Sequence, residues 1–186
     1  SKRDDVYITT EVGQHQMWAA QFLPFDKPNH WMTSGGLGTM GYGLPAAIAA
    51  KIAHPDRTVI CMAGDGCLQM TVNELSTAAQ EGAGVIVIVA NNGRYGTIRM
   101  HQERHYPNRV HGTGLTNPDF AAFAKSFGAH GETVERTEEF LPALQRSVEA
   151  NRAAVIEIRM PQEASTPGAT LEQIREQGRK LRASDS

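Results

Sequence analysis

The sequence predicts an α/β fold in which a doubly wound, mostly parallel sheet carries helices on both faces. Short runs of consecutive apolar, largely β-branched residues alternate with segments of helical periodicity along the 186 residues. Strands that are apolar at consecutive positions are buried on both faces, which is typical of parallel sheets. Such alternation indicates β-α units whose ligands bind beyond the carboxyl ends of the strands.

The expected elements follow in order along the chain. Apolar runs bounded by turn residues favour strands at residues 6–10, 58–63, 85–90 and 153–160. Helical periodicity marks residues 44–54, 72–82, 117–128 and 137–151. We expect Asn117 to cap its helix with Pro118 at the first helical position, and Gly82 and Gly128 to end theirs.

A change of composition divides the chain near residue 160. We place one domain at residues 1–160, which is long enough for a substantial core. Residues 161–186 are polar, and we expect a loop, a short surface helix and a frayed end there.

Bulk composition excludes several classes of protein. Eighteen Lys and Arg against twenty Asp and Glu give a net charge of −2, so we expect neither nucleic acid nor an anionic membrane as partner. The only cysteines, Cys61 and Cys67, suggest no disulfide framework, and a reducing cytoplasm is the natural location. No run approaches a membrane span of about twenty apolar residues, and the start lacks the apolar core of a secretory signal.

Glycine-rich segments lie beside several predicted strands, at residues 11–18, 34–43, 64–66 and 91–96. Gly36, Gly38 and Gly41 form a G-x-G-x-x-G pattern, which raises the alternative of a nicotinamide dehydrogenase. A dinucleotide-binding fingerprint requires a strong preceding strand and an acid about twenty residues later, at the end of the next strand. The preceding "NHWMTS" does not supply such a strand, so this alternative is disfavoured.

The sequence "GDG" at residues 64–66 ends one buried strand, and "NNG" at residues 91–93 ends the next. Each alone is an ordinary turn. In a parallel sheet both turns project from one edge, so Asp65 and Asn92 can face a common point. Magnesium favours oxygen ligands and completes its shell with phosphate oxygens and water. Glycine lets the backbone approach such phosphates, so the pairing predicts a magnesium and diphosphate site.

These residues also resemble a known family. The pattern is similar to the signature of thiamine-diphosphate-dependent enzymes: "GDG" is followed by "NN", with 26 residues between Asp65 and Asn92. "TTEVGQHQMWAAQF" and "TSGGLGTMGYGLPAAIAA" resemble the C-terminal, diphosphate-binding domain of the acetolactate synthase large subunit over roughly residues 6–160. The resemblance implies the thiamine-diphosphate-binding fold, a six-stranded doubly wound sheet, with thiamine diphosphate and Mg²⁺ as cofactors.

The resemblance also assigns roles by matching position. Asp65, Asn92 and the carbonyl of Arg94 would hold the magnesium ion. Met40 would be the apolar wedge that bends the cofactor, so that the cofactor's own amino group reaches the thiazolium carbon. The full set of implied cofactor-binding residues is Gly13, Gln14, His15, Gly38, Met40, Gly64, Gly66, Cys67, Tyr95, Gly96 and Ile98.

Two positions depart from the acetolactate synthase pattern. Thr97 stands where methionine is expected, and His101 stands where a substrate-selecting tryptophan is expected. The cofactor site relies on backbone and Ile98 and survives these changes, whereas the donor and acceptor substrates are left open. Cys67, where serine is common, is a minor change if its backbone N–H does the binding.

The family's activating glutamate comes from a pyrimidine-binding domain of the same or a neighbouring chain, so we expect no catalytic residue in this chain. The implied enzyme decarboxylates a 2-oxo acid and transfers the enamine to a second carbonyl, as a homo-oligomer, and the full-length protein could also carry FAD. The isolated domain would be inactive. Alternatives are another thiamine-diphosphate-dependent decarboxylase, lyase or carboligase, a natural split subunit, or a binding module without chemistry.

Other candidate residues have simpler interpretations. His101, His105 and His111 could form a metal cluster, but the charged residues among them favour a solvated mobile segment. Glu11 is interpreted as structural, because the family's glutamate does not lie there. Residues 17–25, "MWAAQFLPF", could form an aromatic ligand box, although core or subunit interface is favoured.

Overall fold

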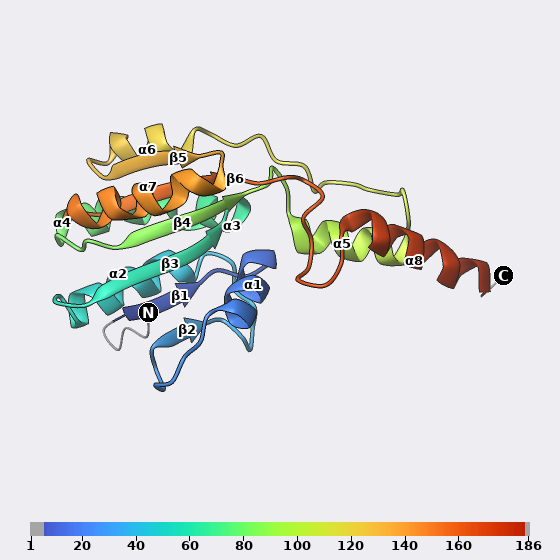
Figure 1. Ribbon diagram of the computed structural model, residues 1–186, viewed down its shortest axis with the longest axis horizontal. Helices are drawn as coiled ribbons and strands as arrows, with labels where there is room; N and C mark the ends of the chain where they lie inside the picture. The colour runs from blue at the N-terminus through green and yellow to red at the C-terminus, as the bar shows by residue number, and fades with distance from the viewer. Residues whose placement is uncertain (1–5, 185–186) are drawn as a thin grey trace.

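A six-stranded parallel sheet forms the centre of the molecule (Figure 1). The computed structural model describes residues 6–184. The strands lie in the order β2-β1-β3-β4-β6-β5, and every neighbouring pair is parallel. This confirms the predicted fold class. The strands are β1 (Val6–Thr10), β2 (Trp31–Thr33), β3 (Thr58–Gly64), β4 (Ile86–Asn91), β5 (His130–Val134) and β6 (Ala154–Arg159).

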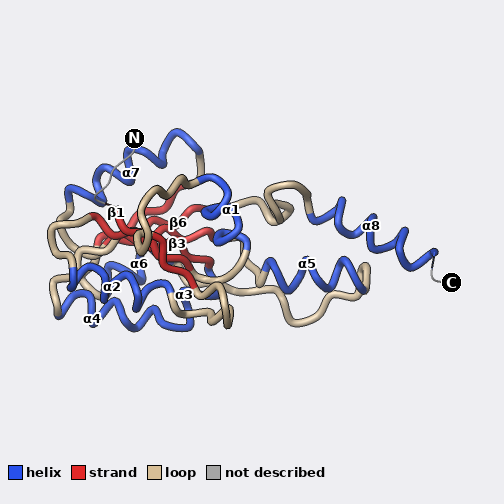
Figure 2. The backbone as a smooth tube through the Cα atoms, turned by 90° about the horizontal axis from the view of Figure 1, so that it is seen from below, coloured by secondary structure: helices blue, strands red, loops and turns tan. Residues whose placement is uncertain are grey.

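Helices cover both faces of the sheet (Figure 2). Helices α2, α4 and α6 share one face, and α7 lies on the other. The helical segments are α1 (Gln14–Phe22), α2 (Gly43–Ala53), α3 (Asp65–Thr71), the 3₁₀ turn η1 (Val72–Glu74), α4 (Leu75–Gln80), α5 (Gly96–His105), α6 (Phe120–Ser126), α7 (Thr137–Glu149) and α8 (Leu171–Ser184).

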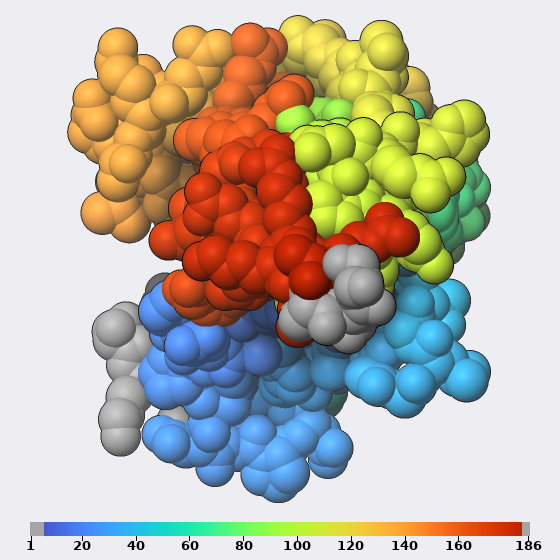
Figure 3. All heavy atoms as spheres, turned by 90° about the vertical axis from the view of Figure 1, so that its right-hand side faces the viewer, coloured from blue at the N-terminus to red at the C-terminus, as the bar shows by residue number. Residues whose placement is uncertain are grey.

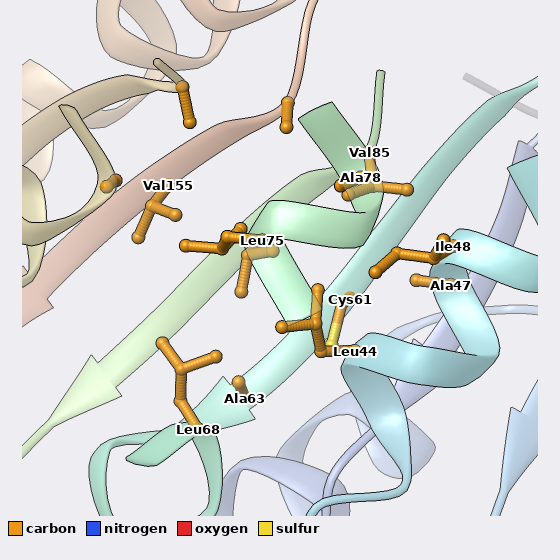
Figure 4. Close-up of a cluster of buried hydrophobic side chains, with 14 of the residues drawn as sticks. Leu44, Ala47, Ile48, Cys61, Ala63, Leu68, Leu75, Ala78, Val85 and Val155 are labelled. Carbon is orange, nitrogen blue, oxygen red and sulfur yellow. The ribbon is translucent and has the colours of Figure 1, made fainter. Parts of the chain in front are cut away.

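The larger hydrophobic core lies between the sheet and the face formed by α2, α4 and α6 (Figure 4). Leu44 of α2, Cys61 of β3 and Leu75 of α4 are almost completely buried in it. A smaller cluster joins Ile88 and Ile156 of the sheet to α7 on the opposite face. The central strands are therefore apolar at consecutive positions because both of their faces are covered.

The four strands predicted from apolar runs form, within one residue at each end, but two strands were not predicted. Strands β2 and β5 are the two edges of the sheet. Each pairs with a single neighbour, and β5 carries polar residues such as His130 and Glu132 that are only partly buried. An edge strand does not need the continuous apolar run by which the central strands were identified.

The predicted helix ends are correct in part. Gly82 and Gly128 follow α4 and α6 with φ of 62° and 76°, as expected for glycine at a helix end. The predicted Asn117 cap is wrong, because α6 begins at Phe120 and the carboxylate of Asp119 caps it by accepting from the Ala122 N–H at 2.8 Å. Helices α1, α3 and α5 lie in segments where no helix was predicted.

Helices α5 and α8 project together from the carboxyl edge of the sheet (Figures 1 and 2). Figure 3, viewed from the end of this projection, shows the two segments in direct contact. The fully buried carboxylate of Glu103 on α5 accepts a 2.9 Å hydrogen bond from the Arg175 guanidinium of α8. A Cβ at Gly178 would stand 2.5 Å from the Arg104 carbonyl, so glycine permits this close approach.

Helix α8 lies in the segment where a short surface helix was expected, and its 14 residues pack along α5. The last residues of the predicted frayed end, 185–186, lie outside the described part of the chain. None of the helices within residues 6–184 is long and apolar enough to cross a membrane.

Candidate cofactor and metal site

The sheet reverses its strand order beside β1, which has β2 on one side and β3 on the other. In open α/β sheets this switch point is where ligands bind, outside the carboxyl ends of the strands. Gly13 follows β1, Asp65 follows β3, and Asn92 follows β4. Because β1, β3 and β4 are adjacent and parallel, their ends bring these three residues to one place.

A cavity of about 170 Å³ lies at this point. Every cofactor-binding and metal residue predicted from the sequence lines it, from Gly13 to Ile98. Four further residues line the cavity without having been predicted to do so: Val12, Trp18, Ala90 and Thr97. Trp18 belongs to the 17–25 segment, where core or interface was favoured, and Thr97 was singled out only as a departure from the family pattern.

Asp65 is a buried carboxylate without a cationic partner among the described residues. It is 3% exposed and begins α3. Its Oδ1 accepts from the Gly66 N–H at 2.9 Å, and its Oδ2 accepts from the Gly93 N–H at 2.8 Å and from Asn117 at 2.7 Å. Burial raises the pKa of this carboxyl group even though Asn117 and nearby backbone N–H groups oppose the shift. A cation at this position would compensate for the lost hydration of the carboxylate.

Asn92 is held by the side chain of Gln14. The Asn92 Nδ2 donates to Gln14 Oε1 at 2.8 Å, and the Gln14 Nε2 donates to the Ala164 carbonyl at 3.1 Å. Since the amide nitrogen of Asn92 is engaged by Gln14, its Oδ1 is the atom available to a metal ion. Gln14, predicted as a cofactor contact, therefore also orients a predicted metal ligand.

A short antiparallel bridge fixes the backbone at Arg94. Arg94 pairs with Gly114, while Tyr95 donates to the Thr113 carbonyl at 2.9 Å and Leu115 donates to the Gly93 carbonyl at 2.8 Å. The Arg94 side chain turns toward the C-terminal segment and contacts the Gln162 side chain. Its backbone carbonyl, rather than its guanidinium, is thus the predicted ligand at this position.

His15 contributes a buried polar atom that has no hydrogen-bond partner within residues 6–184, its Nε2. The residue is 5% exposed and lines the cavity. Burial lowers its pKa to about 4, so the imidazole is neutral near pH 7. An unsatisfied buried nitrogen costs free energy unless a ligand engages it, so Nε2 is a candidate contact for a bound cofactor.

At three glycines the space that a Cβ would fill is occupied by side chains of the cavity wall. A Cβ at Gly64 would stand 2.7 Å from the His15 ring, and one at Gly66 would stand 2.5 Å from the Tyr95 ring. At Gly96 the added Cβ would overlap the Gln14 side chain at 1.8 Å from its Oε1. Any side chain at these positions would displace a residue of the cavity wall.

The residues therefore fit the groups that the resemblance implies. The oxygen donors of Asp65, Asn92 and Arg94 are of the type that magnesium prefers. The N-cap residues of α1 and α5, Gly13 and Tyr95, provide no side-chain acceptor to the first N–H groups of their helices. Helix N-termini favour anionic groups such as phosphate.

Two of the histidines considered as a metal cluster, His101 and His105, lie on α5, and His111 follows that helix. Among the described residues no group of three His, Cys, Asp or Glu side chains could hold a metal ion. The rings of His101 and His105 stack at 6.3 Å on an exposed face of α5. His101 and His105 are exposed to solvent as expected, and residues 96–105 form helix α5.

Three residues near Asp65 were not predicted as part of the site: Asn117, Asn91 and Glu157, which lie one, two and three hydrogen bonds from its carboxylate. Asn91 belongs to the "NN" pair and carried a detectable signal, since it precedes the predicted ligand. Asn117 had been interpreted as a helix cap. Glu157 lies in an apolar strand and is 1% exposed, and only the fold shows its partner.

Comparison with known proteins agrees with this geometry. Residues 11–158 match the family described as "Thiamine pyrophosphate enzyme, C-terminal TPP binding domain". The chain is 45% identical over 158 residues to acetolactate synthase of Arthrospira platensis, which covers 84% of this chain and 27% of that protein. It is 46% identical over 157 residues to the acetolactate synthase large subunit of Corynebacterium glutamicum, and the match covers 82% of this chain and 25% of that protein.

A solved structure shares the fold. The thiamine diphosphate-dependent 4-hydroxybenzoylformate decarboxylase of Rhodococcus jostii RHA1 superposes with a TM-score of 0.79 and 29% identity, over 86% of this chain and 30% of that one. The chain thus spans about a quarter of the length of the curated relatives named above. The chain belongs to the thiamine pyrophosphate enzyme family, as a C-terminal cofactor-binding domain homologous to that of acetolactate synthase large subunits.

Proposed function

We propose that this domain binds thiamine diphosphate through Mg²⁺ within an acetolactate-synthase-like enzyme. That enzyme decarboxylates a 2-oxo acid and joins the remaining fragment to a second carbonyl compound. The observation that carries the proposal is the meeting of Asp65, Asn92 and the Arg94 backbone at one glycine-lined cavity. Homology to acetolactate synthase large subunits supports the reaction class.

The chain's own residues would bind and orient the cofactor. Asp65, Asn92 and the Arg94 carbonyl would hold the magnesium ion, and His15 with the backbone near Gly13 and Gly96 would contact the diphosphate. Met40 and Ile98 would hold the cofactor's rings. Bound thiamine diphosphate supplies the carbanion chemistry of such enzymes.

The remaining parts of the active site come from elsewhere in the enzyme. We propose that a pyrimidine-binding domain, of the same or a neighbouring chain, supplies the activating glutamate, so that this domain is inactive in isolation. A homo-oligomer would then complete the site. Both cysteines are free and buried, which is compatible with a cytoplasmic location. FAD would bind outside this domain.

Calorimetric titration tests the cofactor proposal directly. The complete enzyme, which is this chain together with its pyrimidine-binding domain, is titrated with thiamine diphosphate in the presence and absence of Mg²⁺. We expect binding that requires Mg²⁺ in the wild type and in Asp56→Ala, an exposed aspartate at the opposite end of β3. Asp65→Ala should abolish this binding, and tight binding that ignores both Mg²⁺ and Asp65 would overturn the proposal.

A simple decarboxylase is the second candidate. The observation that favours it is Thr97, which lines the cavity where acetolactate synthases are expected to have methionine. Supplying a 2-oxo acid with and without a second carbonyl compound distinguishes the two. A carbon–carbon coupled product identifies the transferase, whereas CO₂ and an aldehyde alone identify the decarboxylase.

A further inference from the structure

Asn117 reaches the predicted metal site from a distant part of the chain. It lies in the loop between α5 and α6, 52 positions after Asp65. Its Nδ2 donates to Asp65 Oδ2 at 2.7 Å and to Asn91 Oδ1 at 2.7 Å. A primary amide nitrogen carries two N–H donors, so both are used at the two strand ends.

The hydrogen bonds continue from Asn91 into the sheet. Asn91 Nδ2 donates to Glu157 Oε1 at 2.6 Å, and the Gly93 N–H donates to Asn91 Oδ1 at 3.1 Å. Glu157 is 1% exposed and also accepts from the Thr133 hydroxyl at 3.3 Å. The chain of polar groups therefore fixes the position of Asn117 relative to strands β4, β5 and β6.

Asn117 determines which oxygen of Asp65 is available. Asp65 Oδ2 accepts from both Asn117 and the Gly93 N–H, and Oδ1 accepts from the Gly66 N–H. A carboxylate oxygen has about two acceptor sites, so Oδ1 keeps the capacity to bind a cation. Without Asn117 the carboxylate could rotate and exchange its two oxygens.

We propose that Asn117 is a positioning residue for the magnesium site, orienting Asp65 and coupling it to Asn91. This inference rests on the proposed function of the cavity. Metal-site partners that lie beyond the direct ligands typically change metal affinity by about 10-fold to 100-fold when they are mutated. Helix capping, the simpler role, belongs to Asp119.

The experiment measures metal affinity in the complete enzyme at saturating thiamine diphosphate, by calorimetric titration with Mg²⁺ and separately with Ca²⁺. Mg²⁺ demands near-ideal octahedral geometry, whereas Ca²⁺ accepts variable geometry. If Asn117 positions Asp65, Asn117→Ala should lower the affinity for Mg²⁺ by about 10-fold or more and lower the affinity for Ca²⁺ by less. The matched control is Gln69→Ala, which removes the 2.8 Å hydrogen bond that Asn117 Oδ1 accepts on the solvent side.

Each outcome decides the inference. The inference is supported if Asn117→Ala loses affinity for Mg²⁺ and loses less affinity for Ca²⁺. Gln69→Ala should then bind both ions nearly as the wild type does, and the metal-free melting temperature of Asn117→Ala should change little. Unchanged Mg²⁺ affinity, or an equal loss for both ions with a large fall in melting temperature, would overturn it while leaving the proposed function intact. Failure of the wild type to bind either ion would overturn both. If Asn117→Ala does not fold, Asn117→Ser is judged by the same criteria.

Discussion

The buried carboxylate of Glu11 accepts a 2.7 Å hydrogen bond from the backbone N–H of Gly41, at the turn that leads into α2. Its other oxygen accepts from the Leu44 N–H at 3.3 Å, and the residue is fully buried. Glu11 thereby satisfies N–H groups at the start of a helix whose own N-terminus lacks a side-chain cap. The interpretation of Glu11 as structural agrees with this arrangement.

Removing the Glu11 acceptor is expected to destabilise the domain. Glu11→Ala would leave the N–H groups of Gly41 and Leu44 unpaired, at about 1–3 kcal/mol each. Glu11→Gln keeps an acceptor oxygen and removes a charge whose burial raises the pKa of the carboxyl group, so its effect should be smaller. Thermal unfolding measures both variants. If Glu11→Gln instead loses turnover while its melting temperature stays unchanged, Glu11 takes part in the reaction and its role is not only structural.

Gly64→Ala is expected to weaken thiamine diphosphate binding by about 10-fold, which corresponds to the loss of one hydrogen bond of about 1.4 kcal/mol. The added Cβ would stand 2.7 Å from the His15 ring and force that ring to move. Gly36→Ala is the matched control, since its Cβ would meet nothing within 4 Å. Equal affinities in the two variants would show that His15 can move without loss of binding.

The contact between α5 and α8 is expected to weaken in acid. Arg175, with Arg99 and the Asn108 N–H, lowers the pKa of Glu103 to about 2 from an ordinary 4.5. A depressed carboxyl pKa contributes stability that is present above pH 4.5 and lost as the pH falls toward 2. The contact between α5 and α8 should therefore become less stable as the pH falls from 4.5 toward 2. Hydrogen exchange of the α8 amides measures this change.

Glu103→Gln should remove most of this pH dependence and lower the protection of α8 near neutral pH. Glu172→Gln is its control, because Glu172 contacts the same Arg175 but is half exposed. Exposed ion pairs contribute only about 0–1 kcal/mol. An identical pH profile in Glu103→Gln and the wild type would contradict the assignment.

Thr97→Met is expected to change substrate selection more than cofactor binding. The Thr97 hydroxyl is buried without a hydrogen-bond partner in the described part of the chain, and its side chain lines the cavity. A larger apolar side chain should change kcat/KM for 2-oxo acids by about tenfold or more. Thr97→Ser, which keeps the hydroxyl, should stay close to wild type. A parallel loss of thiamine diphosphate affinity would show that the Thr97 side chain acts on the cofactor rather than on substrate selection.

The sequence alone determined the parallel sheet, because its central strands are buried on both faces and must be apolar at consecutive positions. It also determined the pairing of Asp65 with Asn92, since the residues that follow neighbouring parallel strands meet at one edge. Edge strands β2 and β5 escaped prediction, because a strand with one neighbour needs no such apolar run.

Only the tertiary structure decided which residues support the predicted ligands. Asn117 resembled a helix cap in the sequence, yet its amide joins Asp65 to Asn91 across 52 and 26 positions of chain. Glu103 and Arg175 are separated by 72 positions and meet only because α8 packs along α5. A local pattern reports backbone propensity and burial, whereas a hydrogen bond between distant polar side chains depends on where the fold places them.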